Sequence, residues 1–257
     1  VATVFTTQDV LGEALALHAA TRDAAIVSDP VISGWAKSDA YSTSSYTSYT
    51  ATYQTPMFQD GVSPYINEGG DIHFKGGKPV LQTTETVPMV VTVPNGAGPF
   101  PVLLWVDGTG WEQWSHIQSS KLTNALLAAG FAIASYMPQF HGQRATPGAN
   151  AELHTYNFTN PKAGRNVLRQ QVADTSYFIR VLREALPKIS GAPAFDTKRL
   201  VLAGQSQGAQ NGALMAAVEP DIHAYVLNGL ASYLTITVLE RKGETDFEAL
   251  LKAVLGV

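Results

Sequence analysis

The feature that most constrains this chain is Gly204-Gln205-Ser206-Gln207-Gly208, which lies between an apolar run and a helix-forming run. The apolar run, residues 199–203, has the length of a strand, and residues 209–218 are rich in alanine, leucine and methionine. A serine on so sharp a turn from strand to helix projects its hydroxyl away from the sheet. Glycines two positions before and after it let strand and helix approach each other. Ser206 is therefore the candidate catalytic nucleophile.

Length and composition favour an α/β domain with a buried core. The chain has 257 residues, of which 45% are hydrophobic and 15% charged, so disorder is not expected. The net charge is −4 and no cluster of lysine and arginine is present, so we expect no nucleic-acid partner. No apolar run reaches the length of a transmembrane segment. Cysteine is absent, which excludes disulfides and thiolate metal sites, and we expect no metal.

Strands and helices alternate in the second half of the chain. The predicted strands are 101–106, 131–137, 199–203 and 224–227, and the predicted helices are 119–129, 166–186 and 209–218. This alternation indicates a mostly parallel sheet with helices on both faces, joined by right-handed crossovers. Ligands of such sheets gather at the carboxyl ends of the strands, which is where Ser206 falls.

We expect three segments in the chain. Residues 1–66 form an N-terminal extension of one helix and one strand that packs on the core, and residues 67–234 form the α/β core. Residues 235–257 are the start of a cap or lid, because 246–255 reads as an amphipathic helix with Asp246 as its cap and Gly256 as its stop.

A serine nucleophile needs donors that stabilise the oxyanion of the tetrahedral intermediate. One candidate donor is the backbone N–H of Gln207, at the amino end of the predicted helix, where the helix dipole also favours negative charge. The second should come from the glycine-containing loop 107–111, which directly follows the strand 101–106. Within it we favour Thr109 and then Gly110. An ordinary strand-to-helix turn is the alternative interpretation of this loop.

Two further side chains are candidates for a substrate pocket. Trp111 lies beside the predicted oxyanion loop, where it forms either an apolar wall for the acyl group or ordinary packing. His141 follows the strand 131–137 at the correct end of the sheet, within a long polar segment of the kind that often serves a site. We expect His141 to have a structural role or to contact substrate, and not to act as the base. His223 lies at the amino end of its strand, on the wrong side of the sheet for Ser206.

The 204–208 turn, the 107–110 loop and the strand–helix order between them resemble the α/β-hydrolase superfamily over residues 70–232. More narrowly, segments 53–56 and 69–71 are similar to those of secreted bacterial carboxylesterases and lipases, including polyester-hydrolysing enzymes. The resemblance implies hydrolysis of a small or polymeric ester through an acyl-enzyme, without a cofactor. One departure is Asp107-Gly108, where such families often carry His-Gly. A carboxylate there would repel the oxyanion unless it points away.

In this superfamily the catalytic acid and histidine follow the serine in chain order. Only 257 − 206 = 51 residues follow Ser206 here, and His223 is the one histidine among them. We therefore expect the triad acid and histidine not to be in this chain. The last strands of the sheet, the acid and the histidine would lie on a segment outside this sequence, for example a second polypeptide. The start at Val1, without methionine, favours a mature polypeptide that is secreted, periplasmic or on the cell surface.

Three alternatives to an esterase stay open. An acyltransferase would use the same residues with an alcohol in place of water. A serine peptidase of the prolyl-oligopeptidase kind would add paired glutamates and a propeller domain, neither of which is seen. A binding protein that keeps the turn but has lost the triad belongs to a different functional class.

Overall fold

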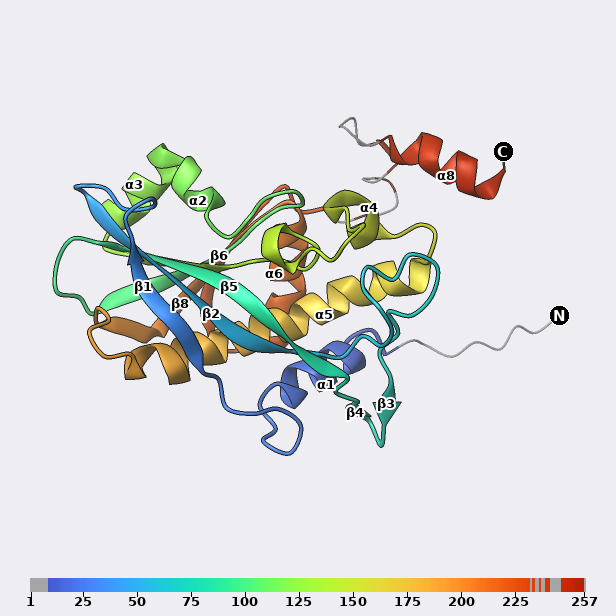
Figure 1. Ribbon diagram of the computed structural model, residues 1–257, viewed down its shortest axis with the longest axis horizontal. Coiled ribbons are helices and arrows are strands. Elements are labelled where there is room, and N and C mark those ends of the chain that lie inside the picture. The colour runs from blue at the N-terminus through green and yellow to red at the C-terminus, as the bar shows by residue number, and fades with distance from the viewer. Residues whose placement is uncertain (1–8, 232, 234–235, 237–238, 241–245, 257) are drawn as a thin grey trace.

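The computed structural model describes residues 9–231, 233, 236, 239–240 and 246–256, in which a seven-stranded sheet lies between two sets of helices (Figure 1). The strands of the sheet are β1 (Ile32–Ser38), β2 (Tyr46–Met57), β5 (Thr83–Pro94), β6 (Phe100–Val106), β7 (Ala132–Tyr136), β8 (Phe195–Gln205) and β9 (Ile222–Asn228). A small hairpin is formed by β3 (Phe74–Lys75) and β4 (Lys78–Pro79). The predicted N-terminal extension and cap include residues 1–8, 235, 237–238, 241–245 and 257, which lie outside the described residues.

One described helix precedes the first six strands, and from β6 onward helices alternate with strands along the chain. The α-helices are α1 (Gly12–Ala20), α2 (Ser115–Gln118), α3 (Ser120–Ala128), α4 (Ala151–Tyr156), α5 (Pro161–Arg180), α6 (Gln207–Val218) and α8 (Phe247–Leu255). Helical turns η1 (Gly142–Arg144), η2 (Val181–Ala185) and η3 (Leu186–Lys188) complete the set, and η2 continues α5 as a π-helical turn. In the described part of the chain no helix combines the length and the apolarity needed to cross a bilayer.

The sheet has the strand order β1-β2-β5-β7-β6-β8-β9. Strands β7, β6, β8 and β9 pair in parallel, whereas β1–β2, β2–β5 and β5–β7 are antiparallel. Consequently β2, β6, β7, β8 and β9 run in one direction, and β1 and β5 in the other. The predicted mostly parallel sheet is confirmed. The chain leaves β6 toward β7 on one side and later enters β8 on the other, so the sheet's topological switch point lies at the carboxyl end of β6.

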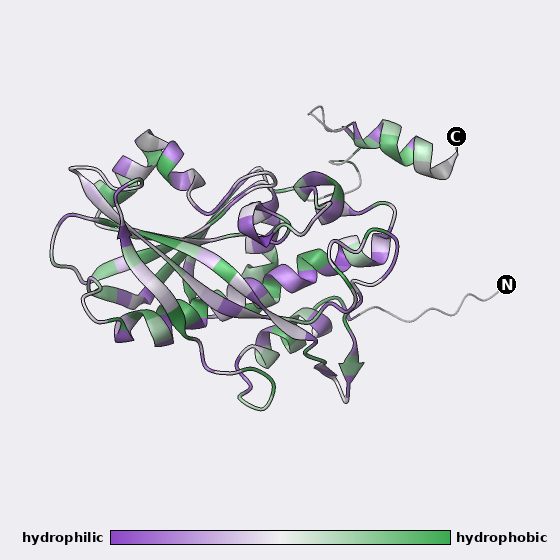
Figure 2. Ribbon diagram, in the orientation of Figure 1, coloured by the Kyte–Doolittle hydropathy of each residue, from purple (hydrophilic) through white to green (hydrophobic). Residues whose placement is uncertain are grey.

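Helices cover both faces of the sheet, as the sequence predicts. The larger core lies on the α1, α5 and α6 face and includes Leu17, Phe178 and Met215. The smaller core lies under α3 and joins Leu127 to Leu103 and Ile133 of the sheet. Figure 2 shows hydrophobic residues concentrated along β5 in the middle of the molecule. Because helices cover both faces of the sheet, the central strands are buried on both sides and read as continuous apolar runs.

Strand β1 escaped prediction, and the start of helix α5 was predicted too late. Strand β1 is mostly exposed, and its register shifts between Ser33 and Ala36, where Gly34 takes a φ of +65°. A bulge of this kind removes the two-residue alternation by which a strand is recognised. Helix α5 begins at Pro161, five residues before the predicted start, with the Asn160 side chain accepting the Ala163 N–H as its cap.

Helix α8 has the caps that the sequence predicts. The Asp246 carboxylate accepts the N–H of Ala249, and Gly256 ends the helix at a φ of +72°. Its first residue, Phe247, is fully buried and makes edge contacts with the rings of Tyr156 and Phe158 at 5.5 Å. These aromatic contacts attach α8 to the segment around α4. A role for α8 as a lid stays a prediction.

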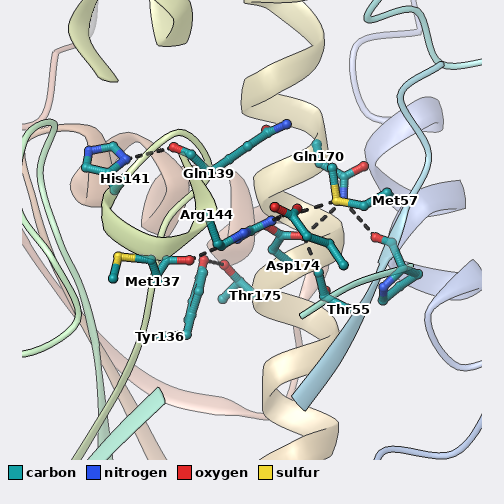
Figure 3. Close-up of polar contacts among 12 residues, drawn as sticks. Thr55, Met57, Tyr136, Met137, Gln139, His141, Arg144, Gln170, Asp174 and Thr175 are labelled. Carbon is teal, nitrogen blue, oxygen red and sulfur yellow. Dashed lines mark hydrogen bonds and ion pairs between the residues drawn. The ribbon is translucent and has the colours of Figure 1, made fainter. Parts of the chain in front are cut away.

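A buried polar cluster joins the loop after β7 to helix α5 and to strands β2 and β5 (Figure 3). Arg144 at its centre has a side chain with no exposed surface, and it binds Asp174 at 2.8 Å and Glu85 at 2.9 Å. Its guanidinium also donates to the Met137 carbonyl at 2.9 Å, where β7 has just ended. The Asp174 carboxylate in turn accepts from Gln170 and Thr55. The cluster therefore fixes the loop 137–145 against the body of the domain.

Replacing Arg144 by methionine should destabilise the protein by about 3–5 kcal/mol, because it leaves the Asp174 carboxylate buried without its cation. The matched control is Lys162→Met, which breaks the surface pair with Asp71, where the lysine side chain is 61% exposed. That loss should cost about 1 kcal/mol or less. Urea unfolding of both variants measures the two values. Equal losses would show that the Arg144 cluster contributes no more than a surface pair.

Candidate functional site

The turn around Ser206 is built by glycines for which no other residue can substitute without movement of the backbone. A Cβ on Gly204 would overlap the carbonyl group of Gly208, and a Cβ on Gly208 would overlap the carbonyl group of Val106. The first turn of α6 thus presses directly on the end of β8 and on the end of β6. This contact sets the position of Ser206 relative to the loop that follows β6.

Ser206 itself has a backbone conformation that non-glycine residues rarely adopt. Its φ is +53° and its ψ −114°, and it stands immediately before the first residue of α6. Its N–H donates to the carbonyl of Asn228 at 2.9 Å, at the carboxyl end of β9. Gly229 follows at a φ of +70°, and a Cβ there would lie 3.7 Å from the Ser206 nitrogen. The strained serine is therefore held between the ends of β8 and β9.

The loop after β6 passes alongside Ser206. A Cβ on Gly108 would lie 3.1 Å from the Ser206 Cβ and would overlap the side-chain oxygen of Gln205, so the backbone of this loop packs directly against the 205–206 turn. The Thr109 hydroxyl donates to the side-chain carbonyl of Gln207 at 2.7 Å, which ties the loop to α6. The sequence-predicted serine and loop are thus neighbours, at the topological switch point of the sheet. Their roles as nucleophile and oxyanion donors stay predictions.

The predicted donors differ in their hydrogen bonding. Gln207 is the first residue of α6, so its N–H has no partner within the helix and lies at the positive end of the helix dipole. The Gly110 N–H donates to Nε2 of His141 at 2.8 Å and is therefore already bonded within the protein. Trp111, the predicted pocket wall, is 50% exposed beside this loop. His141 is buried, with 3% of its surface exposed.

The Asp107 carboxylate points away from Ser206. Its oxygens accept hydrogen bonds from the indole N–H of Trp105 and the hydroxyls of Ser115 and Ser135. Ser135 lies on β7, which pairs with β6 on the side opposite β8, so the carboxylate faces away from the strand that carries the serine. Burial raises the pKa of Asp107 to about 6, although the three hydrogen bonds oppose this shift. Asp107, which stands where similar families often carry histidine, therefore does not place its carboxylate against the predicted oxyanion.

In the described residues no histidine is hydrogen-bonded to Ser206. His223 is the second residue of β9 and is exposed, five residues before Asn228 and hence about 16 Å from the serine end of the strand. His116 is buried against Thr92, and burial lowers its pKa to about 4. His154 on α4 accepts the N–H of Asn150, the residue that precedes this helix. Across the described ranges no group of three or more histidine, aspartate or glutamate side chains is arranged to hold a metal ion.

Comparison with known proteins gives a structural match without a sequence match. No protein-family model and no curated protein sequence matches the chain. The acetyl xylan esterase from Paenibacillus sp. R4 superimposes with a TM-score of 0.52 at 12% identity, over 98% of this chain and 70% of that enzyme. A putative dienelactone hydrolase from Klebsiella pneumoniae gives a TM-score of 0.38 at 21% identity, over 56% of this chain. This chain spans about half of that second protein, with 54% of it covered.

The chain has the α/β-hydrolase fold. At 12% identity the match to the Paenibacillus esterase shows the fold alone, and the solved structures that resemble the chain include several esterases. The chemistry must therefore be argued from the residues around Ser206.

Sequence reasoning missed two residues and one hydrogen bond that shape this site. Asn228 and Gly229 border Ser206, and an Asn-Gly pair directly after a strand is a turn signal that could have indicated them. His141 was singled out, but its bond to the Gly110 N–H could not be read from a separation of 31 residues.

The raised pKa of Asp107 predicts a pH-dependent loss of stability. The folded protein binds this proton more tightly than the unfolded chain, so the contribution of Asp107 to stability falls as pH rises from about 4 to about 6. Asp107→Asn keeps an acceptor for Trp105 and Ser115 and can donate to Ser135. The unfolding free energy of the wild type minus that of Asp107→Asn should therefore fall by on the order of 3 kcal/mol between pH 4 and pH 7.

Denaturant unfolding at a series of pH values measures this difference. Asp39→Asn, at a side chain that is 95% exposed, serves as the control for the change of charge. A difference that stays constant with pH, or that grows as pH rises, would contradict the assignment of a buried, destabilised carboxylate at Asp107.

Proposed function

We propose that the protein is a serine hydrolase that cleaves carboxylic esters through an acyl-enzyme on Ser206. The observation that carries the proposal is the strained turn, with Ser206 at a φ of +53° and the Gly108 backbone beside it. Strain of this kind is retained at functional sites, where the surrounding structure enforces it. The position at the carboxyl edge of the sheet, next to the amino end of α6, supports the same function.

In the proposed reaction the Ser206 hydroxyl oxygen attacks the ester carbonyl carbon while a general base takes its proton. The resulting oxyanion accepts hydrogen bonds from the Gln207 N–H and from a main-chain N–H of the loop after β6, of which Thr109 is the favoured donor. Collapse of this intermediate breaks the bond to the alkoxy oxygen, which leaves as the alcohol with the proton from the base. Water then attacks the acyl-enzyme by the same route and releases the carboxylic acid.

We propose that the base and its orienting acid come from a segment outside this sequence. No histidine of the described residues is bonded to Ser206. In the same ranges β9 pairs with β8 alone, and Val226 on β9 is 59% exposed, so this edge of the sheet is open to a further strand. A strand added there, from the same chain or from a second polypeptide, would end beside Asn228 and Ser206.

Trp111 and His141 are proposed to border the substrate. The half-exposed Trp111 ring is suited to contact an acyl or alcohol group, whereas the buried His141 would have to act through the loop that it holds. Transfer of the acyl group to an alcohol uses the same residues. One observation favours a non-catalytic binding protein as the second candidate: the histidines of the described residues have other hydrogen-bond partners or lie distant from Ser206.

A fluorophosphonate probe should label the protein at Ser206, because labelling requires an activated serine. The experiment uses protein purified from its source with every polypeptide that accompanies it, and intact mass shows whether a second fragment is present. Ser206→Ala should lose the label and reduce ester hydrolysis by at least about a thousandfold. Ser119→Ala, at an exposed serine outside the site, is the matched control and should label as the wild type does.

The products distinguish the alternatives. Labelling with release of acid from an ester supports the esterase, transfer to an added alcohol supports the acyltransferase, and cleavage of peptides alone supports the peptidase. A folded protein that binds its accompanying polypeptides yet does not label at Ser206 contradicts the hydrolase proposal and favours the binding protein.

A further inference from the structure

The imidazole of His141 is the acceptor for a main-chain N–H of the predicted oxyanion loop. Its Nε2 accepts the Gly110 N–H at 2.8 Å, and its Nδ1 lies 2.7 Å from the Gln139 carbonyl oxygen. A carbonyl oxygen can only accept, so Nδ1 must carry the ring proton, and Nε2 must then present its lone pair to Gly110. Both bonds form in one state only, the neutral imidazole protonated at Nδ1.

The ring is held in that orientation by a braced loop. The backbone N–H of Arg144 donates to the His141 carbonyl at 2.8 Å, and the Arg144 side chain anchors the loop to Asp174 and to the Met137 carbonyl. Figure 3 shows the His141 ring directed toward the Gln139 carbonyl, above this cluster. The side-chain N–H of Gln139 in turn donates to the side-chain amide oxygen of Gln59 at 3.1 Å.

The surroundings of the His141 ring favour its neutral form. Burial is the largest effect and lowers the pKa of His141, and the positive charge of Arg144 lowers it further. The opposing contribution is the hydrogen bond to the Gln139 carbonyl. The carboxylate of Glu112 lies near the same loop, with its Oε2 2.6 Å from where a Cβ on Gly142 would be. A protonated ring would direct an N–H at the Gly110 N–H, two donors facing each other.

We propose that His141 is a positioning residue, whose neutral imidazole holds the 107–110 loop against Ser206 by accepting the Gly110 N–H. The loop is then clamped from two sides, by His141 on the loop after β7 and by the Thr109–Gln207 hydrogen bond on α6. Because the Gly110 N–H already donates to His141, an oxyanion would need a different main-chain N–H of this loop. This agrees with the choice of Thr109 as the favoured donor. The catalytic part of this inference rests on the proposed hydrolase function.

Two variants test the hydrogen bonds of the two ring nitrogens separately. In His141→Asn the side-chain amide replaces Nδ1–H and can still donate to Gln139, but it is too short to reach Gly110. In His141→Gln the longer side chain places an amide oxygen near the position of Nε2, where it can accept the Gly110 N–H. Amide hydrogen exchange of Gly110 should be about tenfold faster in His141→Asn than in the wild type, and His141→Gln should restore most of the protection.

Nitrogen-15 spectra of the wild-type imidazole provide a readout that needs no variant to fold. They should show a protonated Nδ1 and an unprotonated Nε2 at pH 7. Protonation at Nε2, or equal Gly110 exchange in the wild type and His141→Asn, would overturn the inference whether or not the protein is an enzyme.

The labelling rate of Ser206 tests the catalytic consequence. His141→Asn should react with the fluorophosphonate about tenfold or more slowly than the wild type, with His141→Gln recovering most of the rate. Wild-type protein that does not label counts against the hydrolase function, and the exchange and nitrogen-15 results still decide whether His141 holds the loop. Equal labelling rates for the wild type and His141→Asn would refute the positioning role of His141 and leave the hydrolase function standing.

Discussion

The contact between the first turn of α6 and the ends of β6 and β8 determines where Ser206 lies relative to the loop after β6. It exists because Gly204 and Gly208 have no side chains, and a Cβ on either would overlap a backbone carbonyl group of a neighbouring segment. This close approach bends the chain sharply enough to hold Ser206 at a positive φ. It also places the serine directly beside Gly108. The geometry that suggests nucleophilic chemistry thus follows from backbone packing at the switch point of the sheet.

Buried polar groups hold the loops around this contact in place. The Asp107 carboxylate is held away from Ser206 by hydrogen bonds from Trp105 and two serine hydroxyls, and its burial there raises its pKa. Arg144 fastens the loop after β7 to α5 and to β5 through ion pairs with Asp174 and Glu85. Buried pairs of this kind contribute little net stability compared with apolar packing, but removal of one partner leaves an uncompensated buried charge. Both groups lie at the carboxyl edge of the sheet, where ordered loops matter for a site.

Much of the fold could be predicted from sequence because its signals are local. The apolar runs of β6, β7 and β8, the periodicity of α5 and the glycines around Ser206 each reflect burial or backbone geometry within a few residues. Strand β1 escaped prediction because a bulge at Gly34 and broad exposure remove its alternation. The bond between Gly110 and His141 joins two loops on neighbouring strands, so it depends on the strand order and on a ring tautomer. No local pattern encodes either.

The most direct test of the account is a high-resolution crystal structure of the protein after phosphonylation of Ser206. The account predicts that one phosphoryl oxygen lies about 2.7–3.1 Å from the Gln207 main-chain nitrogen and from a main-chain nitrogen of the loop after β6. A phosphoryl oxygen that faces solvent, or that contacts no main-chain N–H of that loop, would contradict the claim that the close approach of β6, β8 and α6 builds an oxyanion site.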